Sequence, residues 1–214
     1  MGQYAEIFKT HDEYESSSGK AVWNYCIKDA EIHYNPPAPT YEYVDLGLPS
    51  GTLWAKWNVG ATSETEYGNY YRYGRGAATY KETSGDSRYS GTENPLAASA
   101  DTAAQVWGGS WHMPTKAQFS ELMRNTNYEW TTIDGVNGGK FTATNGNYVF
   151  FPATGNFNND YYYDEGITGY YWTSTYNNEE GVYFFFCAAD DWDVFPNGDS
   201  VYESVGSSVR PVVG

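Results

Sequence analysis

Gly169-Tyr-Tyr-Trp-Thr-Ser-Thr175 opens the most informative stretch of this sequence, and Ser208-Val-Arg-Pro-Val212 closes it. Between these motifs lies the run Gly181-Val-Tyr-Phe-Phe-Phe-Cys-Ala-Ala-Asp-Asp-Trp-Asp-Val-Phe-Pro-Asn-Gly-Asp-Ser-Val-Tyr202. Its polar side chains are almost all Asp, Asn or Ser, and it contains no Lys, Gln or Met. Rigid aromatic groups beside small polar groups are typical of binding loops, because they give contact area at a low cost in side-chain entropy. We therefore interpret residues 181–202 as a binding surface.

The composition indicates a loop-rich, mostly β protein. Aromatic residues make up 19% of the 214 residues, with 22 Tyr and 23 Gly, and charged residues make up only 18%. The formal net charge of -15 argues against nucleic-acid binding, because phosphate contacts need clustered Lys and Arg. No apolar run is long enough to span a bilayer, and the first residues lack the basic and apolar regions of a secretory signal. We therefore expect no nucleic-acid partner and no membrane insertion.

Two modules are expected. Residues 1–34 predict a small N-terminal β module, which is too short to hold much core alone. Residues 35–40 read Asn-Pro-Pro-Ala-Pro-Thr and predict an extended linker, because consecutive prolines stiffen the chain. The main domain is therefore expected to span 41–214.

The main domain is expected to have an α+β fold, with sparse helices followed by short strands. The pattern of residues 43–55 predicts a hairpin around a Pro-Ser-Gly turn, and residues 74–94 predict a long surface loop. Helices are predicted over 101–105 and 114–124, where apolar residues recur at helical spacing. Short strands are predicted over 140–143, 148–152, 170–175, 182–187 and 207–212.

The segment 155–166 is polar and aromatic and allows two interpretations. As a loop it would expose Tyr161, Tyr162 and Tyr163 together, which in a monomer marks a contact surface. Alternatively, the three tyrosines form a ladder packed on a neighbouring sheet. The sequence leaves both open.

Five motifs follow one another in the main domain: Tyr43-Val-Asp-Leu-Gly-Leu-Pro-Ser-Gly-Thr-Leu-Trp-Ala55, Asn58-Val-Gly-Ala-Thr62, Trp107-Gly-Gly-Ser-Trp-His-Met-Pro-Thr115, Gly169-Tyr-Tyr-Trp-Thr-Ser-Thr175 and Ser208-Val-Arg-Pro-Val212. In this order they resemble the formylglycine-generating-enzyme-like branch of the C-type lectin fold, over about residues 41–213. Within that branch the chain is most similar to variable proteins of diversity-generating retroelements from gut anaerobes and their phages. The resemblance implies two helices, short antiparallel strands, long loops and a variable region at about 169–212. In such proteins a reverse transcriptase rewrites the adenines of Asn-type codons.

The residue types in 181–202 fit this resemblance. Randomising the first two bases of AAC codons yields residues that include Phe, Tyr, Cys, Asp, Ala, Val, Gly, Ser, Pro and Asn, but never Trp, Glu, Lys, Gln or Met. Only Trp192 lies outside the reachable set. By the family pattern Trp192, Val194 and Pro196 look like scaffold positions, although Trp192 also fits a hot-spot anchor. The resemblance implies these variable, ligand-binding positions: Phe184, Phe186, Ala188, Asp190, Asp191, Asp193, Phe195, Asn197, Asp199, Ser200 and Tyr202. Additional contacts are expected from Tyr161, Tyr162, Tyr163, Asn177, Asn178 and Trp192.

The N-terminal module is similar to a short segment of tail-associated proteins of phages of gut bacteria, through Phe8-Lys-Thr-His-Asp-Glu-Tyr14 and Glu31-Ile-His-Tyr-Asn-Pro36. This implies attachment to a particle, and an extracellular location on a phage or a bacterial cell surface. The implied partner is a protein or glycan receptor on a cell surface. A homotrimer or particle-borne array would strengthen weak binding through multivalency. The alternative for this module is a plain β appendage.

The sequence lacks a complete catalytic set. Formylglycine-generating enzymes use active-site cysteines, whereas Cys187 is the only cysteine of the main domain, and His11, His33 and His112 are far apart. His112 is expected to make a structural hydrogen bond. The triplets of calcium-dependent sugar sites are absent, although the many Asp and Asn residues leave a structural calcium open. We therefore expect a non-enzymatic receptor-binding protein without cofactor or metal. The alternatives are an adhesin of fixed specificity on a bacterial surface or pilus, and an enzyme of the formylglycine-generating type.

Overall fold

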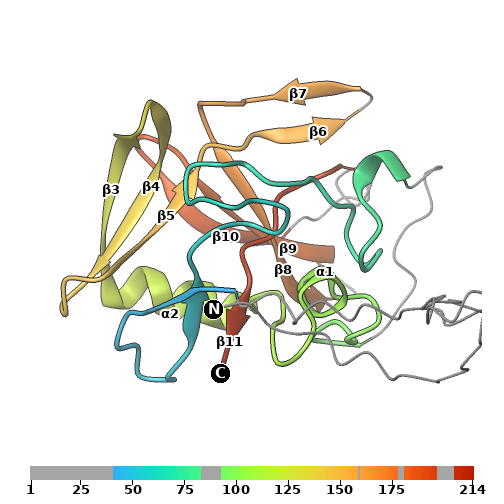
Figure 1. Cartoon of the computed structure of the whole chain (residues 1–214), viewed down its shortest axis with the longest axis horizontal. Helices are drawn as coiled ribbons and strands as arrows, with labels where there is room; N and C mark the ends of the chain where they lie inside the picture. The colour runs from blue at the N-terminus through green and yellow to red at the C-terminus, as the bar shows by residue number, and fades with distance from the viewer. Residues whose placement is uncertain (1–40, 83–92, 159, 178–180, 197–204) are drawn as a thin grey trace, which may run out of the picture. The chain divides into compact units, whose positions relative to one another are not determined.

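The structure is a computed structural model that describes residues 41–82, 93–158, 160–177, 181–196 and 205–214 (Figure 1). Pro39–Gly214 forms one compact unit. The expected N-terminal module over 1–34 and the expected linker over 35–40 lie outside the described residues. The described residues therefore all belong to the main domain.

The described residues form an α+β domain with two α-helices and four small sheets, which agrees with the expected fold class. The helices are α1 (Thr102–Val106) and α2 (Lys116–Asn125), and a 3-10 helix, η1, covers Tyr80–Glu82. All named strand pairs are antiparallel. One sheet has the order β1 (Tyr43–Asp45), β2 (Leu53–Ala55) and β11 (Val212–Val213). A second has the order β3 (Thr126–Ile133), β4 (Val136–Ala143) and β5 (Tyr148–Pro152). The third has the order β10 (Trp192–Pro196), β9 (Gly181–Cys187) and β8 (Gly169–Asn177), and the fourth pairs β6 (Asn156–Asn158) with β7 (Tyr161–Tyr163).

The two helices begin where the sequence supplies hydrogen-bonding caps. Asp101 caps α1 by accepting from the Ala104 amide at 2.9 Å, and its other oxygen accepts from the Met113 amide at 2.8 Å. Thr115 caps α2 in a capping box with Gln118, so that two amide groups of the first turn are satisfied. Phe119 of α2 is buried and stacks on Phe185 of β9 at 4.5 Å. These caps fix α2 against the sheet that carries the predicted variable run.

The strand β11 joins the C-terminal segment to the β1–β2 hairpin, because Val212 pairs with Trp54. Just before β11, the buried guanidinium of Arg210 donates hydrogen bonds to four oxygens. Its acceptors are Asn58 Oδ1 at 2.8 Å, the carbonyls of Ala55 and Lys56 at 3.1 and 2.7 Å, and the Phe150 carbonyl at 2.8 Å. Arg210 therefore ties three separate segments together, a role that the Ser-Val-Arg-Pro-Val motif alone does not reveal.

Several sequence predictions need correction. Residues 155–166 do not form a plain loop, because β6 and β7 pair as a hairpin within them. The strand predicted over 207–212 is reduced to β11, since Ser207 and Ser208 make only isolated bridges with Tyr71 and Tyr171. The surface loop predicted over 74–94 contains η1, and Tyr80 is buried by edge contact with Phe157. Residues 83–92 of that loop lie outside the described residues.

Candidate functional site

The strand β9 separates the aromatic run into an inner and an outer row of side chains. Successive side chains of a strand point to opposite faces of the sheet. Tyr183, Phe185 and Cys187 are accordingly buried in the core, whereas Phe184 and Phe186 are only partly buried. From Tyr183 to Cys187 the positions thus alternate between buried and partly buried, as in a half-buried strand, although the sequence there is almost uniformly apolar. Val182, on the same side of the strand as Phe184, is also buried.

The neighbouring strand β10 continues both rows. Val194 lies opposite Phe185 and is buried, whereas Phe195 lies opposite Phe184 and is 43% exposed. Phe195 stacks on Phe186 at a centroid distance of 5.3 Å. Asp193 is exposed and lies opposite Phe186. Four of the predicted variable residues, Phe184, Phe186, Asp193 and Phe195, therefore share the outer face of β9 and β10.

The turn between β9 and β10 carries the other predicted variable residues that the structure describes. The Ala188 amide donates to the Asp191 carbonyl at 2.8 Å and closes the turn. Asp190 and Asp191 are exposed there, and Ala188 is partly buried. The Ala188 carbonyl also accepts a hydrogen bond from the Tyr128 hydroxyl. The turn is thus held to β3 through its backbone while its carboxylates face outward.

Trp192 does not join the outer aromatic row. It lies opposite Cys187 and on the same side of β10 as the buried Val194. Its ring is 38% exposed and stacks on Tyr128 of β3 at 3.9 Å. Of the two roles weighed for this residue, the packing on β3 favours a scaffold role that holds the edge of β10.

The hairpin β6–β7 forms a second wall beside the outer face of β8 and β9. All three tyrosines of β7 are exposed. Tyr162 also packs against Phe157 of the same hairpin at 4.7 Å and against Tyr70 at 5.4 Å. The three exposed rings agree with the contact-surface interpretation and not with a ladder packed on a neighbouring sheet. Tyr163 pairs with Asn156 and faces β8 with it.

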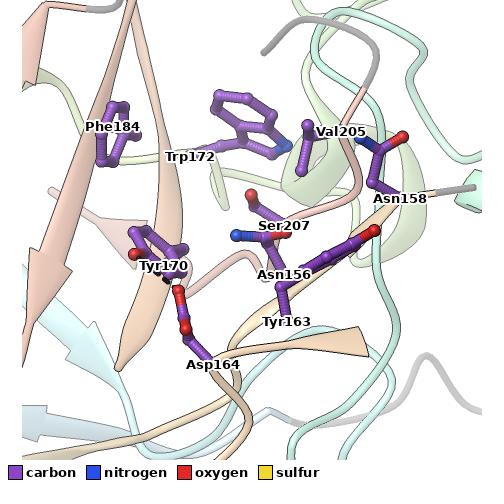
Figure 2. A pocket seen from close by; sticks show the side chains of 9 residues that line it. All are labelled: Asn156, Asn158, Tyr163, Asp164, Tyr170, Trp172, Phe184, Val205 and Ser207. Atoms are coloured by element: carbon purple, nitrogen blue, oxygen red, sulfur yellow. Dashed lines mark hydrogen bonds between the residues drawn. The ribbon is translucent and has the colours of Figure 1, made fainter. Parts of the chain in front are cut away.

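An open cavity of about 400 Å³ lies between this hairpin, the outer face of β8–β9 and the segment that leads to β11 (Figure 2). The Asp164 carboxylate accepts a hydrogen bond from the Tyr170 hydroxyl at 3.2 Å, and Figure 2 shows the two side chains turned toward each other. The indole of Trp172 is fixed by donation to the Tyr71 carbonyl at 2.7 Å. The cavity is lined by Asn156, Asn158, Tyr163, Asp164, Tyr170, Trp172, Phe184, Val205 and Ser207. Only Phe184 and Tyr163 of this set were predicted as site residues.

One signal in the sequence points to two of the missed residues. Asn156 and Asn158 flank the buried Phe157, so the polar–apolar alternation already indicates that both face away from the core. Tyr170 lies inside a motif that the resemblance treats as scaffold, and Ser207 directly precedes another, which concealed their position on the cavity wall.

The remaining predicted site residues are not placed. Asn178, Asn197, Asp199, Ser200 and Tyr202 lie outside the described residues, and only the backbone of Asn177 is described, at the end of β8. The structure therefore brings together part of the predicted variable set.

A second cavity, of about 660 Å³, lies between β1, residues 56–65 and the β4–β5 turn. Polar groups within it already pair with protein partners. Lys56 forms an ion pair with Glu42 at 2.6 Å, and the Tyr148 hydroxyl donates to Glu64 at 3.1 Å. Because these polar groups already have protein partners, fewer polar groups of this cavity are available to bind a ligand.

The chemistry of Cys187 fits a core position. Its side chain is fully buried, and burial raises the pKa of the thiol to about 12, so a thiolate is disfavoured at neutral pH. His112 Nδ1 lies 3.1 Å from the Ser110 carbonyl oxygen, in keeping with the structural role expected for it. Among the described residues, no group of three His, Cys, Asp or Glu side chains is arranged to hold a metal ion. No helix in the described part of the chain has the length and apolar character needed to cross a membrane.

Three comparisons with known proteins were made with family models, curated proteins and solved structures. No family model, no curated protein and no solved structure matches this chain.

Proposed function

We propose that this domain is a non-enzymatic receptor-binding protein that presents the outer face of β8–β10 and the hairpin β6–β7 to a ligand. We further propose that its scaffold is a C-type lectin-like fold of the formylglycine-generating-enzyme-like branch. In this proposal a retroelement diversifies the outer face. The protein acts outside the cell, on a phage particle or a bacterial surface, and binds a protein or glycan receptor.

The observation that carries this proposal is the separation of variable positions from buried positions along β9, the following turn and β10. The predicted variable positions that the structure describes are all partly buried or exposed, and Phe184 alone of them packs against a core cluster: Phe184, Phe186, Ala188, Asp190, Asp191, Asp193 and Phe195. The positions between them that are buried are Tyr183, Phe185, Cys187 and Val194. A surface that changes between descendants needs this separation, because substitutions in a close-packed core destabilise the fold.

The residue types on the outer face also support a binding role. Phe186 and Phe195 form a stacked pair, and aromatic side chains dominate the energetics of protein interfaces. The exposed carboxylates of Asp190, Asp191 and Asp193 lie beside that pair and supply polar selection. Apolar anchors ringed by polar groups are the usual composition of such interfaces.

The position of Cys187 supports the non-enzymatic part of the proposal. An oxidase of the formylglycine-generating type needs accessible cysteine chemistry, whereas this thiol is fully buried behind Gly139 and Gly169. We expect a cysteine-containing peptide incubated with the full chain to keep its thiol, as measured by mass spectrometry. Conversion of that cysteine to formylglycine would establish the enzymatic alternative.

Sequencing of the source locus tests diversification. We expect a near-copy of the segment encoding 169–212 beside a reverse-transcriptase gene, with AAC codons at the outer-face positions and none at Phe185 or Val194. A locus without such a copy would leave an adhesin of fixed specificity as the better description.

A pair of variants tests binding by the same face. The double variant Phe186→Ser/Phe195→Ser changes outer side chains, and Asp134→Asn changes an exposed residue in the turn between β3 and β4, which is not part of the outer face. We expect both proteins to fold, and only the double variant to lose attachment to intact cells of gut bacteria that the unmodified protein binds. Equal attachment by both variants would show that the outer face is not the binding surface.

A further inference from the structure

The cavity between β6–β7 and β8–β9 has a composition that selects for one kind of group. Among the described residues, its lining carries the Asp164 carboxylate and contains no Lys, Arg or His. Oxygen acceptors are also offered by the carboxamides of Asn156 and Asn158 and the hydroxyl of Ser207. A ligand group that enters this cavity therefore meets negative charge and several acceptors.

Aromatic rings form the remaining walls. Tyr170 and Phe184 lie 5.9 Å apart on the outer face of β8 and β9, and Tyr163 faces them from the hairpin. The negative face of an aromatic ring attracts a cation, and a planar guanidinium stacks on such a ring better than an ammonium does. The combination of ring faces with a carboxylate is what an arginine side chain requires, since its fork of donors matches a carboxylate in its plane.

Two described cations pack against rings on the other side of the hairpin. Lys81 lies over the ring of Phe157 at 5.4 Å, and Arg72 lies over Tyr80 at 4.4 Å. Phe157 is buried and alternates with the two asparagines that line the cavity, so these cations are directed to the opposite face of β6. The carboxylate in the cavity thus has no described basic side chain of this protein in the lining to neutralise it.

We propose that this cavity receives an arginine side chain of a protein receptor. This inference rests on the proposed binding function and adds that the receptor is a protein with an exposed basic segment. The formal net charge of -15 favours the same choice, because it attracts a basic partner over the distance of approach. In this arrangement Asp164 pairs with the guanidinium, which lies against the aromatic wall that Tyr163, Tyr170 and Phe184 form.

The structure offers a conservative variant for the test. Asp164 has a φ of 56°, a left-handed conformation that asparagine adopts as readily as aspartate, so Asp164→Asn removes the charge and keeps the turn. The amide oxygen of the new side chain still accepts from the Tyr170 hydroxyl. Asp134→Asn is the matched control, because Asp134 is also exposed with a φ of 48° and lies outside the cavity.

The experiment is an NMR titration of the isotope-labelled full chain with acetyl-arginine-amide. Two further titrations use acetyl-citrulline-amide, which replaces the guanidinium by a neutral urea group, and a series of methyl glycopyranosides. We expect the arginine derivative to shift the signals of Asn156, Tyr170 and Ser207, and the citrulline derivative to bind about threefold to fivefold more weakly, as for an exposed charge pair. Asp164→Asn should weaken arginine binding by a similar factor and leave citrulline binding unchanged. Added salt should weaken only the arginine complex.

Three results would overturn the inference: equal affinity for arginine and citrulline, an unaltered affinity in Asp164→Asn, or a glycopyranoside that occupies the cavity in their place. Failure of the proposed function can be distinguished from failure of this inference. If arginine does not bind while Phe186→Ser/Phe195→Ser still abolishes cell attachment, the outer face is a binding surface and the cavity is not an arginine site. If neither measurement gives a signal, both proposals are wrong.

Discussion

Replacing Arg210 by methionine is expected to destabilise the domain strongly. The change deletes four hydrogen bonds from a fully buried guanidinium, to Asn58, Ala55, Lys56 and Phe150, and leaves their oxygens without that donor. Each buried acceptor left unsatisfied costs about 1–3 kcal/mol, but relaxation and the lost desolvation penalty of the cation offset part of the sum. Removing one partner of a buried charged network typically costs about 3–5 kcal/mol. We therefore expect the free energy of unfolding to fall by about 4 kcal/mol.

Urea denaturation followed by tryptophan fluorescence measures this change. A domain of this size loses about 2–4 °C in Tm for each kcal/mol, so the midpoint of thermal unfolding should fall by about 8–16 °C. Arg124→Met is the control. Arg124 is exposed in the last turn of α2 and donates only to the Ser120 carbonyl at 3.0 Å, so its loss should change stability by less than about 0.5 kcal/mol. Arg210→Lys keeps the charge but not the planar fork, and should fall between the two. A loss of less than about 1 kcal/mol in Arg210→Met would refute the proposed role of this residue in joining the three segments.

Three further predictions follow from the packing of single side chains. Phe185→Ser should lower the free energy of unfolding by about 3–5 kcal/mol, because Phe185 is fully buried and stacked on Phe119. Phe186→Ser should lower it by less than about 1 kcal/mol. Equal losses in urea denaturation would contradict the two-row arrangement of β9. Thr115→Ala should cost about 1 kcal/mol by removing the capping box of α2, and an unchanged urea midpoint would show that packing alone fixes this helix. Burial raises the pKa of Cys187 from 9.0 to about 12, so the native thiol keeps its proton where the unfolded thiol loses it; the free energy of unfolding attributable to Cys187 should fall as pH rises from 9 toward 12, and the native thiol should resist iodoacetamide at pH 8, as read by peptide mapping. Rapid modification of native Cys187 would show that the thiol is accessible.

The sequence predicts those elements whose signal is local. The strand over 148–152 is found as β5 with the same bounds, and the hairpin predicted over 43–55 is found as β1 and β2, because a Pro-Ser-Gly turn separates alternating residues. Both helices are found within two residues of their predicted ends, since Asp101 and Thr115 provide caps that the sequence displays.

Elements that depend on distant partners are missed. The sequence of β10 is short, contains a single acidic residue and shows no alternation, and it becomes a strand only because it pairs with β9 from Trp192 to Pro196. The strand β3 shows the alternation of Tyr128 and Trp130 with polar residues, but its eight-residue pairing with β4 is set by the Asp134-Gly135 turn. The role of Arg210 depends on oxygens more than fifty residues away, which no local pattern encodes.

The candidate site also has one part that the local sequence predicts and one part that depends on distant contacts. Its outer row on β9 and β10 follows from period-two alternation once both strands are known, so the variable positions named from the sequence fall largely on one face. Its cavity requires the pairing of Asn156 with Tyr163 and the approach of the segment before β11, where Phe157 and Gly206 exchange backbone hydrogen bonds at 2.8 and 2.7 Å. The hairpin is therefore positioned by the same segment that carries Arg210 into the core. A substitution at Arg210 that loosens this segment should alter the cavity wall while leaving the stacked pair of Phe186 and Phe195 in place, since that pair depends only on the β9–β10 register.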